Sequence, residues 1–156
     1  MLSAYNVACR SSLFAKDSNG GMWTKSVGNG LFAGVDFSSG AFIAEFVGEL
    51  ISCELFRTRA SEGKGGYGIK VKSGVVLDCY EHAKSGHCFA SMANSPLNAM
   101  IELCHNNGKS RFKKAVANCK IVVCQVSLSV SLRTTAPVSR GAEFCYRYGK
   151  SYSKYF

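Results

Sequence analysis

Short runs of β-branched and aromatic residues, separated by glycines, dominate this sequence. The chain has 16 glycines and only 2 prolines in 156 residues. Such runs favour strands, and the glycines between them favour tight turns. We expect strands within 30–37, 41–51 and 119–136, and a hairpin over 67–77 that turns around Ser73. The pattern therefore predicts a mostly β fold of many short strands.

Helices are expected to be few and short. Residues 54–60 are the best helix candidate, and residues 82–92 have the pattern of a helical turn or two. Residues 96–117 are the least regular stretch, with the turn sequence Asn106-Asn107-Gly108 and several basic residues after it. We interpret this basic stretch as a long surface loop inserted into the fold, of a kind that often carries function.

The size and composition are those of one ordinary globular domain, which we expect to span residues 1–156. Apolar residues make up 47% of the chain and charged residues 19%. No apolar run approaches the roughly 20 residues needed to span a bilayer. Residues 1–16 contain no acid, which is weakly typical of a mitochondrial transit peptide, but they fit a first strand equally well. We expect an intracellular protein of the nucleus or cytoplasm.

The eight cysteines are scattered, and no two of them form a C-x-x-C pair. Without a secretory leader, they favour free thiols buried in apolar strands over a disulfide framework. A zinc site would have to use His82, His87, Cys88 or the Cys104-His105 pair. Structural zinc normally has closely paired ligands, so we expect no bound metal.

The net charge of +9 comes entirely from the last third of the chain. Residues 1–102 contain nine basic and nine acidic residues, whereas residues 103–156 contain ten basic residues and one acid, Glu143. A basic region of this kind attracts nucleic acid, acidic protein or an anionic surface, or is simply a solvated face. The charge therefore bears on partners and says little about chemistry.

Four blocks of sequence carry the strongest functional signal. The first is a Gly-Asn-Gly turn at 28–30 that leads into Leu31-Phe32-Ala33 and then into residues 40–49, GAFIAEFVGE. Glycines allow a backbone to approach a ligand closely, although a lone G-x-G is commonly just a turn. The second block begins at Tyr67 and runs through a strand-like segment to Asp78.

The other two blocks lie in the second half of the chain. The third contains Asn94 within the sequence MANSP and continues, after the basic stretch, at Ala117-Asn118-Cys119. The fourth comprises residues 130–135 and 140–149, the latter reading RGAEFCYRYG. Together, and in this order, the blocks resemble the SET domain family of protein-lysine methyltransferases over nearly the whole chain.

The resemblance implies a SET-type β-clip fold with several short sheets, few short helices and a C-terminal pseudoknot. It also implies transfer of a methyl group from S-adenosylmethionine to a lysine side chain of a histone or another protein. Cysteine-rich zinc segments often flank SET domains, and the sequence shows none, so we expect a minimal SET domain.

The resemblance also assigns roles to single residues. Tyr148 takes the main catalytic position, and Tyr146 lines the lysine channel. Ser91 stands where the family usually has arginine, Ser95 where it has histidine, and Arg147 where an acid is common. The residues expected to hold the cofactor are Gly28, Asn29, Gly30, Tyr67, Asn94, Ser95 and Tyr148.

Two other functions remain open. One is an inactive SET-like module that binds protein or nucleic acid through the basic region 103–156, which the serines at 91 and 95 favour. The other is an unrelated nucleic-acid-binding β domain, whose C-terminal tyrosines would stack on bases. A histone tail is itself basic, so a methyltransferase of this charge would need a locally acidic groove, for which the candidates are Glu45, Glu49, Glu54 and Glu62.

Overall fold

The computed structural model describes residues 6–12, 14–18, 22–24, 29–94, 99–106, 109–114 and 116–148. Side chains are described within 6–12, 29–94 and 116–148. Contacts divide the chain into two compact units. The first unit comprises residues 1–41, 93–120 and 134–147, and the second comprises residues 42–92, 121–133 and 148–156.

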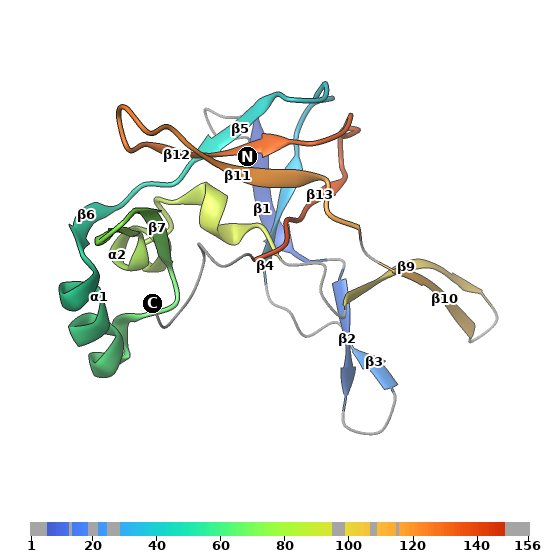
Figure 1. The fold of residues 1–156 in the computed structure, drawn as a ribbon. Coiled ribbons are helices and arrows are strands. Elements are labelled where there is room, and N and C mark those ends of the chain that lie inside the picture. Colours follow the sequence, from blue (N-terminus) through green and yellow to red (C-terminus); the bar gives the residue numbers. More distant parts are fainter. Residues whose placement is uncertain are drawn as a thin grey trace. The chain divides into compact units, whose positions relative to one another are not determined.

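The described strands form four small sheets (Figure 1). The first contains β1 (Val7–Ser11), β4 (Asn29–Ala33) and β13 (Glu143–Phe144), in that order. The second has the order β10 (Lys109–Lys114), β9 (Ala99–Asn106), β2 (Phe14–Ser18) and β3 (Met22–Thr24). The third has the order β11 (Cys119–Val123), β12 (Val130–Thr134) and β5 (Phe42–Glu45), and the fourth has the order β6 (Glu49–Ser52), β8 (Val75–Asp78) and β7 (Gly68–Lys72). The prediction of a mostly β fold of short strands is confirmed.

The expected hairpin over 67–77 is present as the antiparallel pair β7 and β8. Gly74 in its turn has a φ of 75°, a left-handed conformation that favours glycine. The two strands expected within 119–136 are β11 and β12. Local turn chemistry was sufficient to predict these pairs, because their partners are close in the sequence.

The expected helix is α1 (Cys53–Arg59), followed by a π-helical turn at Ala60–Lys64. Its first turn is capped by Ser52, whose hydroxyl accepts from the backbone N–H of Leu55 (3.1 Å). Phe56 is buried from α1 against Ile51 and Val76 of the adjoining sheet. Two helical turns overlap the segment 82–92 in which they were expected: α2 (Tyr80–Lys84), which begins two residues earlier, and a 3-10 turn at Phe89–Met92.

The expectation of an irregular loop over residues 96–117 is wrong. Most of this segment forms an antiparallel hairpin of β9 and β10 (Figure 1), and β9 also pairs with β2. Asn106 pairs with Lys109, which leaves two residues between the strands. An Asn-Gly pair between two strand-like runs is the strongest short sequence signal for a hairpin. Residues 107 and 108 themselves lie outside the described residues. The turn sequence was recognised, but the run of basic residues after it favoured a surface loop over a strand.

The C-terminal part of the first unit lies among segments from distant parts of the chain. β13 pairs with β4, through Glu143 with Phe32 and Phe144 with Leu31. The next residue, Cys145, makes a parallel bridge with Asn94. This placement of the C-terminal segment is what the predicted pseudoknot requires.

The seven cysteines with described side chains are free thiols. Cys79, Cys88, Cys119 and Cys145 are buried as expected. Cys9 and Cys124 are exposed, so the expectation of burial is wrong for these two, and Cys104 lies outside the described side chains. Among the described helices, none has both the length and the apolar character needed to cross a membrane.

Candidate active site

Asn94 lies at the centre of a hydrogen-bonded cluster in the first unit. Its Nδ2 donates to the carbonyl oxygen of Asn29 (3.1 Å) and to Oε1 of Glu143 (3.1 Å). Both N–H bonds of the amide are used in this way, so the group that the side chain can offer to a ligand is its acceptor, Oδ1. The cluster joins the first, third and fourth sequence blocks.

Glu143 is a buried carboxylate, only 7% exposed. Its Oε1 also accepts from the hydroxyl of Ser12 (2.6 Å), a residue at the end of the N-terminal strand segment. A methyl group added to Gly30 would overlap this carboxylate oxygen. Glycine is therefore needed at position 30 to leave room for the carboxylate beside β4.

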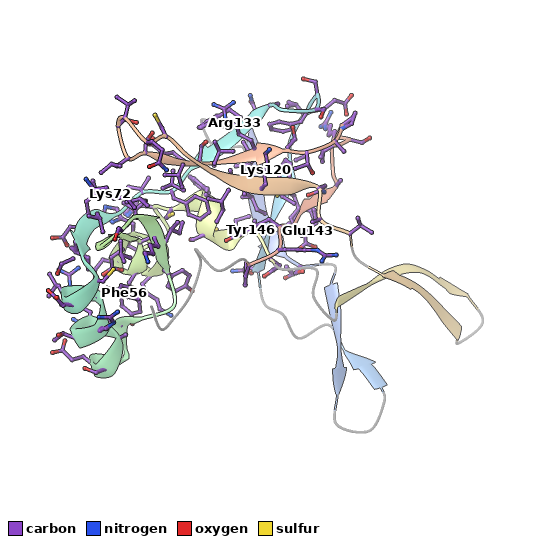
Figure 2. The ribbon with its side chains drawn as sticks, in the orientation of Figure 1. Phe56, Lys72, Lys120, Arg133, Glu143 and Tyr146 are labelled. Carbon is purple, nitrogen blue, oxygen red and sulfur yellow. The ribbon has the colours of Figure 1, made fainter. Side chains whose placement is uncertain are left out.

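Asn118 holds the backbone that carries Glu143. Its Oδ1 accepts from the backbone N–H of Cys145 (2.9 Å), and its Nδ2 donates to the carbonyl oxygen of Glu143 (3.0 Å). Tyr146 follows on the same segment, as Figure 2 shows, and its N–H donates to the carbonyl oxygen of Asn94 (3.0 Å). Tyr146 is 1% exposed and is a core residue of the first unit, and its role in a lysine channel stays a prediction.

Tyr67 belongs to an aromatic cluster in the second unit. The Tyr67 and Tyr80 rings have their centroids 6.1 Å apart in an edge-to-face arrangement. The Lys84 ammonium lies 5.7 Å from the Tyr67 ring centroid and 5.6 Å from that of Tyr80, within the range of cation–π attraction. The cluster can therefore accommodate a cationic amine on aromatic faces.

Tyr148, the predicted catalytic residue, also belongs to the second unit. Protein atoms around its hydroxyl desolvate it, although the residue as a whole keeps 43% of its surface exposed. This desolvation, and secondarily the neighbouring Tyr67, raises the pKa of Tyr148 to about 12. The phenol is therefore protonated throughout the physiological pH range and can both donate and accept a hydrogen bond.

An acidic pocket of about 220 Å³ lies in the second unit. Arg59 Nη1 donates to Oδ2 of the buried Asp78 (2.9 Å) and to Oε2 of Glu49 (3.0 Å). Two of the acids expected in a substrate groove, Glu49 and Glu62, line this pocket, whereas Glu45 lines a separate pocket of about 290 Å³. The lining residues are Glu49, Arg59, Glu62, Lys64, Asp78, Tyr80 and Glu81.

The structure thus brings Asn29, Gly30 and Asn94 together in the first unit, and Tyr67 and Tyr148 in the second. Gly28 and Ser95 lie outside the described residues. The residues that sequence reasoning missed are Glu143 and Ser12. The signal for Glu143 was its position as the only acid in a strongly basic third of the chain, which we considered only as part of the charge balance.

A family model of the SET domain matches residues 28–149. This span covers most of the chain and includes all four sequence blocks, so the chain belongs to the SET domain family, whose methyltransferases use S-adenosylmethionine. The family prediction made from the sequence is therefore confirmed. No curated protein matches the chain in sequence.

Solved structures show the same fold. ctPRC2 in an autoinhibited conformation bound to S-adenosylmethionine is 18% identical, with a TM-score of 0.61 over 96% of this chain and 16% of that one. An inhibitor-bound humanized mutant of the Chaetomium thermophilum Polycomb Repressive Complex 2 is also 18% identical, with a TM-score of 0.61 over 97% and 16%. The chain spans about a sixth of the length of these chains. The SET-type fold is confirmed.

The first unit has features that fit the methionine end of S-adenosylmethionine. Asn94 presents an acceptor oxygen, because both N–H bonds of its amide are directed at protein acceptors. The α-ammonium group of the cofactor is a hydrogen-bond donor and matches that acceptor. Of the described residues expected to hold the cofactor, Asn29, Gly30 and Asn94 lie in the first unit and Tyr67 and Tyr148 in the second, and their cofactor roles stay predictions.

Proposed function

We propose that this protein is a protein-lysine N-methyltransferase that uses S-adenosylmethionine. Its membership of the SET family supports the reaction class. The observation that carries the lysine assignment is the placement of Tyr148, whose hydroxyl is desolvated by surrounding protein atoms and lies near Tyr67. A neutral phenol among aromatic rings suits a lysine amine, which has to lose both its charge and its hydration before it reacts.

The reaction is a displacement in which a lysine nitrogen forms a bond to the methyl carbon as the carbon–sulfur bond breaks. S-adenosylmethionine supplies the methyl group and a neutral thioether as leaving group. A lysine ammonium has no lone pair, and its unperturbed pKa is near 10.4. Tyr148 would accept a hydrogen bond from the neutral amine and hold its lone pair in line, and such positioning contributes several kcal/mol. Tyr146 would serve as a wall of the lysine channel.

The proposed substrate is a histone or another basic protein. The acidic pocket is lined by four acids against two bases, Arg59 and Lys64. It supports this substrate class, because its net negative charge would attract basic side chains that flank the target lysine. The similar structures named above are Polycomb Repressive Complex 2 chains, which is compatible with a chromatin substrate and a nuclear location.

The test combines binding and transfer. Calorimetry with S-adenosylmethionine should give micromolar binding to the wild-type chain and at least tenfold weaker binding to Asn94→Ala, about 1.4 kcal/mol. Tritiated methyl transfer to core histones and to a mixed protein extract should then be lost in Tyr148→Phe. Lack of binding at millimolar cofactor would refute the enzyme. Binding without transfer to any protein would refute the lysine assignment.

A second candidate function is binding of nucleic acid or an acidic protein by an inactive SET-like module. One observation favours it: the basic segment with Lys109, Arg111, Lys113 and Lys114 is β10, a strand at the edge of its sheet. DNA binding that falls steeply with salt, and that Lys113→Ala with Lys114→Ala weakens, would support it. Methyl transfer with salt-insensitive, weak DNA binding would exclude it.

A further inference from the structure

We propose that Glu143 is a positioning residue that fixes the polarity of the Asn94 amide. In this arrangement Glu143 and the carbonyl oxygen of Asn29 both accept from Nδ2 of Asn94. The Asn94 Oδ1 is thereby committed to receiving a hydrogen bond from the α-ammonium group of the cofactor. The inference rests on the proposed function and adds to it the residue that makes the cofactor site selective for a cationic donor.

The two acceptors around Nδ2 allow only one orientation of the amide. A 180° flip of Asn94 would turn Oδ1 toward a carboxylate oxygen and a carbonyl oxygen, neither of which has a proton to donate. The carboxylate contributes more to this preference, because hydrogen bonds to an ionised acceptor are roughly twice as strong as neutral ones. Loss of Glu143 would leave the weaker neutral acceptor alone to orient the amide.

Glu143 is itself held in place without a ligand. The Ser12 hydroxyl donates to the same Oε1 at 2.6 Å, and the missing side chain of Gly30 makes room for that oxygen. The Glu143 backbone is paired with Phe32 of β4 and bonded to the Asn118 amide. A carboxylate fixed in this way behind Asn94 also adds electrostatic attraction for a cation on the ligand side.

The alternative is that Glu143 only fills the space beside Gly30 and supports the strand. A pair of ligands separates the two roles: S-adenosylhomocysteine, and its analogue in which hydrogen replaces the α-amino group. The measured quantity is the ratio of their dissociation constants, obtained by calorimetry at pH 7. A purely structural role changes both constants together, whereas a positioning role changes their ratio.

Four proteins are compared: the wild-type chain, Asn94→Ala, Glu143→Met and Glu143→Gln. The wild-type chain should prefer the amino-bearing ligand by about tenfold or more. Asn94→Ala should abolish the preference, and Glu143→Met, which keeps the size but has no strong acceptor, should reduce it to about threefold or less. Glu143→Gln should retain most of it, because its side-chain oxygen can still accept from Asn94.

Each outcome decides the question. An unchanged ratio in Glu143→Met, with both ligands weakened alike, would show that Glu143 is only structural. A wild-type chain that binds both ligands equally would overturn the assigned polarity of Asn94 while leaving the enzyme proposal standing. A wild-type chain that binds neither ligand would refute the proposed function itself. Should Glu143→Met fail to fold, Ser12→Ala, which removes one restraint on the same carboxylate oxygen, should lower the ratio about twofold to threefold, and an unchanged ratio there would refute the positioning role.

Discussion

The two units of the molecule hold their candidate site residues in opposite ways. In the first unit, Ser12, Asn94 and Glu143 form a cluster joined by hydrogen bonds of 2.6 to 3.1 Å, with its carboxylate buried. In the second unit, Tyr67, Tyr80 and Lys84 meet through ring contacts of 5.6 to 6.1 Å. Tyr148 in the same unit keeps 43% of its surface exposed.

The difference shows how one chain can combine a rigid hydrogen-bonded cluster with a more tolerant aromatic one. Hydrogen bonds weaken steeply as their distance and angle depart from the ideal values. A side-chain amide whose N–H bonds are all used within a cluster therefore offers a ligand only its acceptor oxygen. Aromatic and cation–π contacts tolerate a range of geometries, which would suit the flexible lysine side chain of the proposed substrate. We therefore expect substitutions in the first unit to affect affinity or stability, and those in the second to affect rate.

The largest effect is expected from Tyr148→Phe, which keeps the ring and removes the hydroxyl. Methyl transfer should fall by roughly a hundredfold or more, a typical loss for a group that acts on the reacting atoms. The dissociation constant for S-adenosylmethionine should change by less than about threefold. Single-turnover transfer and calorimetry measure the two quantities. A loss of affinity equal to the loss of rate would break the proposed division between the units.

The next largest effect is expected on stability from Asn118→Ala. The substitution removes hydrogen bonds to the backbone of Glu143 and Cys145 and leaves those groups unpaired in a buried segment. We expect a loss of about 2 to 4 kcal/mol in the free energy of unfolding, measured with urea. Asn29→Ala, at an exposed position whose backbone oxygen holds Asn94, is the matched control and should cost within about 0.5 kcal/mol.

Each unit has one exposed cysteine thiol with a described side chain, Cys9 in the first and Cys124 in the second, and their reactivities test the local environments. Hydrogen bonds from the Ser127 hydroxyl and nearby backbone N–H groups lower the pKa of Cys124, whereas burial raises the pKa of Cys9. Because the thiolate is the reactive form, iodoacetamide at pH 7.5 should alkylate Cys124 several-fold faster than Cys9. Peptide mass spectrometry measures both rates, and the difference should shrink above pH 9. Equal rates at pH 7.5 would contradict the assigned environments.

A smaller effect is expected from Lys84→Met, which keeps an apolar stem and removes the charge over Tyr67 and Tyr80. Exposed cation–π contacts contribute about 0.5 to 1 kcal/mol, so the loss of stability should not exceed about 1 kcal/mol. Lys72→Met, at an exposed position of β7, is the matched control and should be neutral. A larger loss than about 2 kcal/mol would mean that the aromatic cluster is as rigid as the polar one.

A further effect is expected only at alkaline pH. The pKa of Tyr148 in the folded protein, about 12, lies above that of an unfolded tyrosine, near 10. The stability linked to this group is therefore complete below pH 10 and is lost as pH rises toward 12. The melting temperatures of the wild-type chain and Tyr148→Phe should differ by a constant amount from pH 7 to 9. Above pH 10 the melting temperature of the wild type should fall relative to that of the variant. A gap that changes below pH 9 would contradict the raised pKa.

Features set by short stretches of sequence were predictable, and features set by distant pairing were not. The turn at Gly74 and the cap at Ser52 depend on neighbouring residues, so the β7–β8 hairpin and α1 were expected nearly as they are. The two-residue strand β13 has no signal of its own and exists because it pairs with β4. The motif likewise identified Asn94 and Gly30, but only their spatial convergence revealed Glu143 as the group between them.

The cluster around Glu143 has a consequence for how the protein is made. Ser12 bonds to Glu143, and Arg10 to the carbonyl oxygen of Gly141, across separations of 131 residues. A ribosome must therefore synthesise the chain as far as Glu143 before the cluster around this residue can form, and β4 has no β13 to pair with until then. Contacts this far apart along a chain slow folding and leave strand edges exposed meanwhile. The nascent chain should thus depend on chaperones more than its small size suggests.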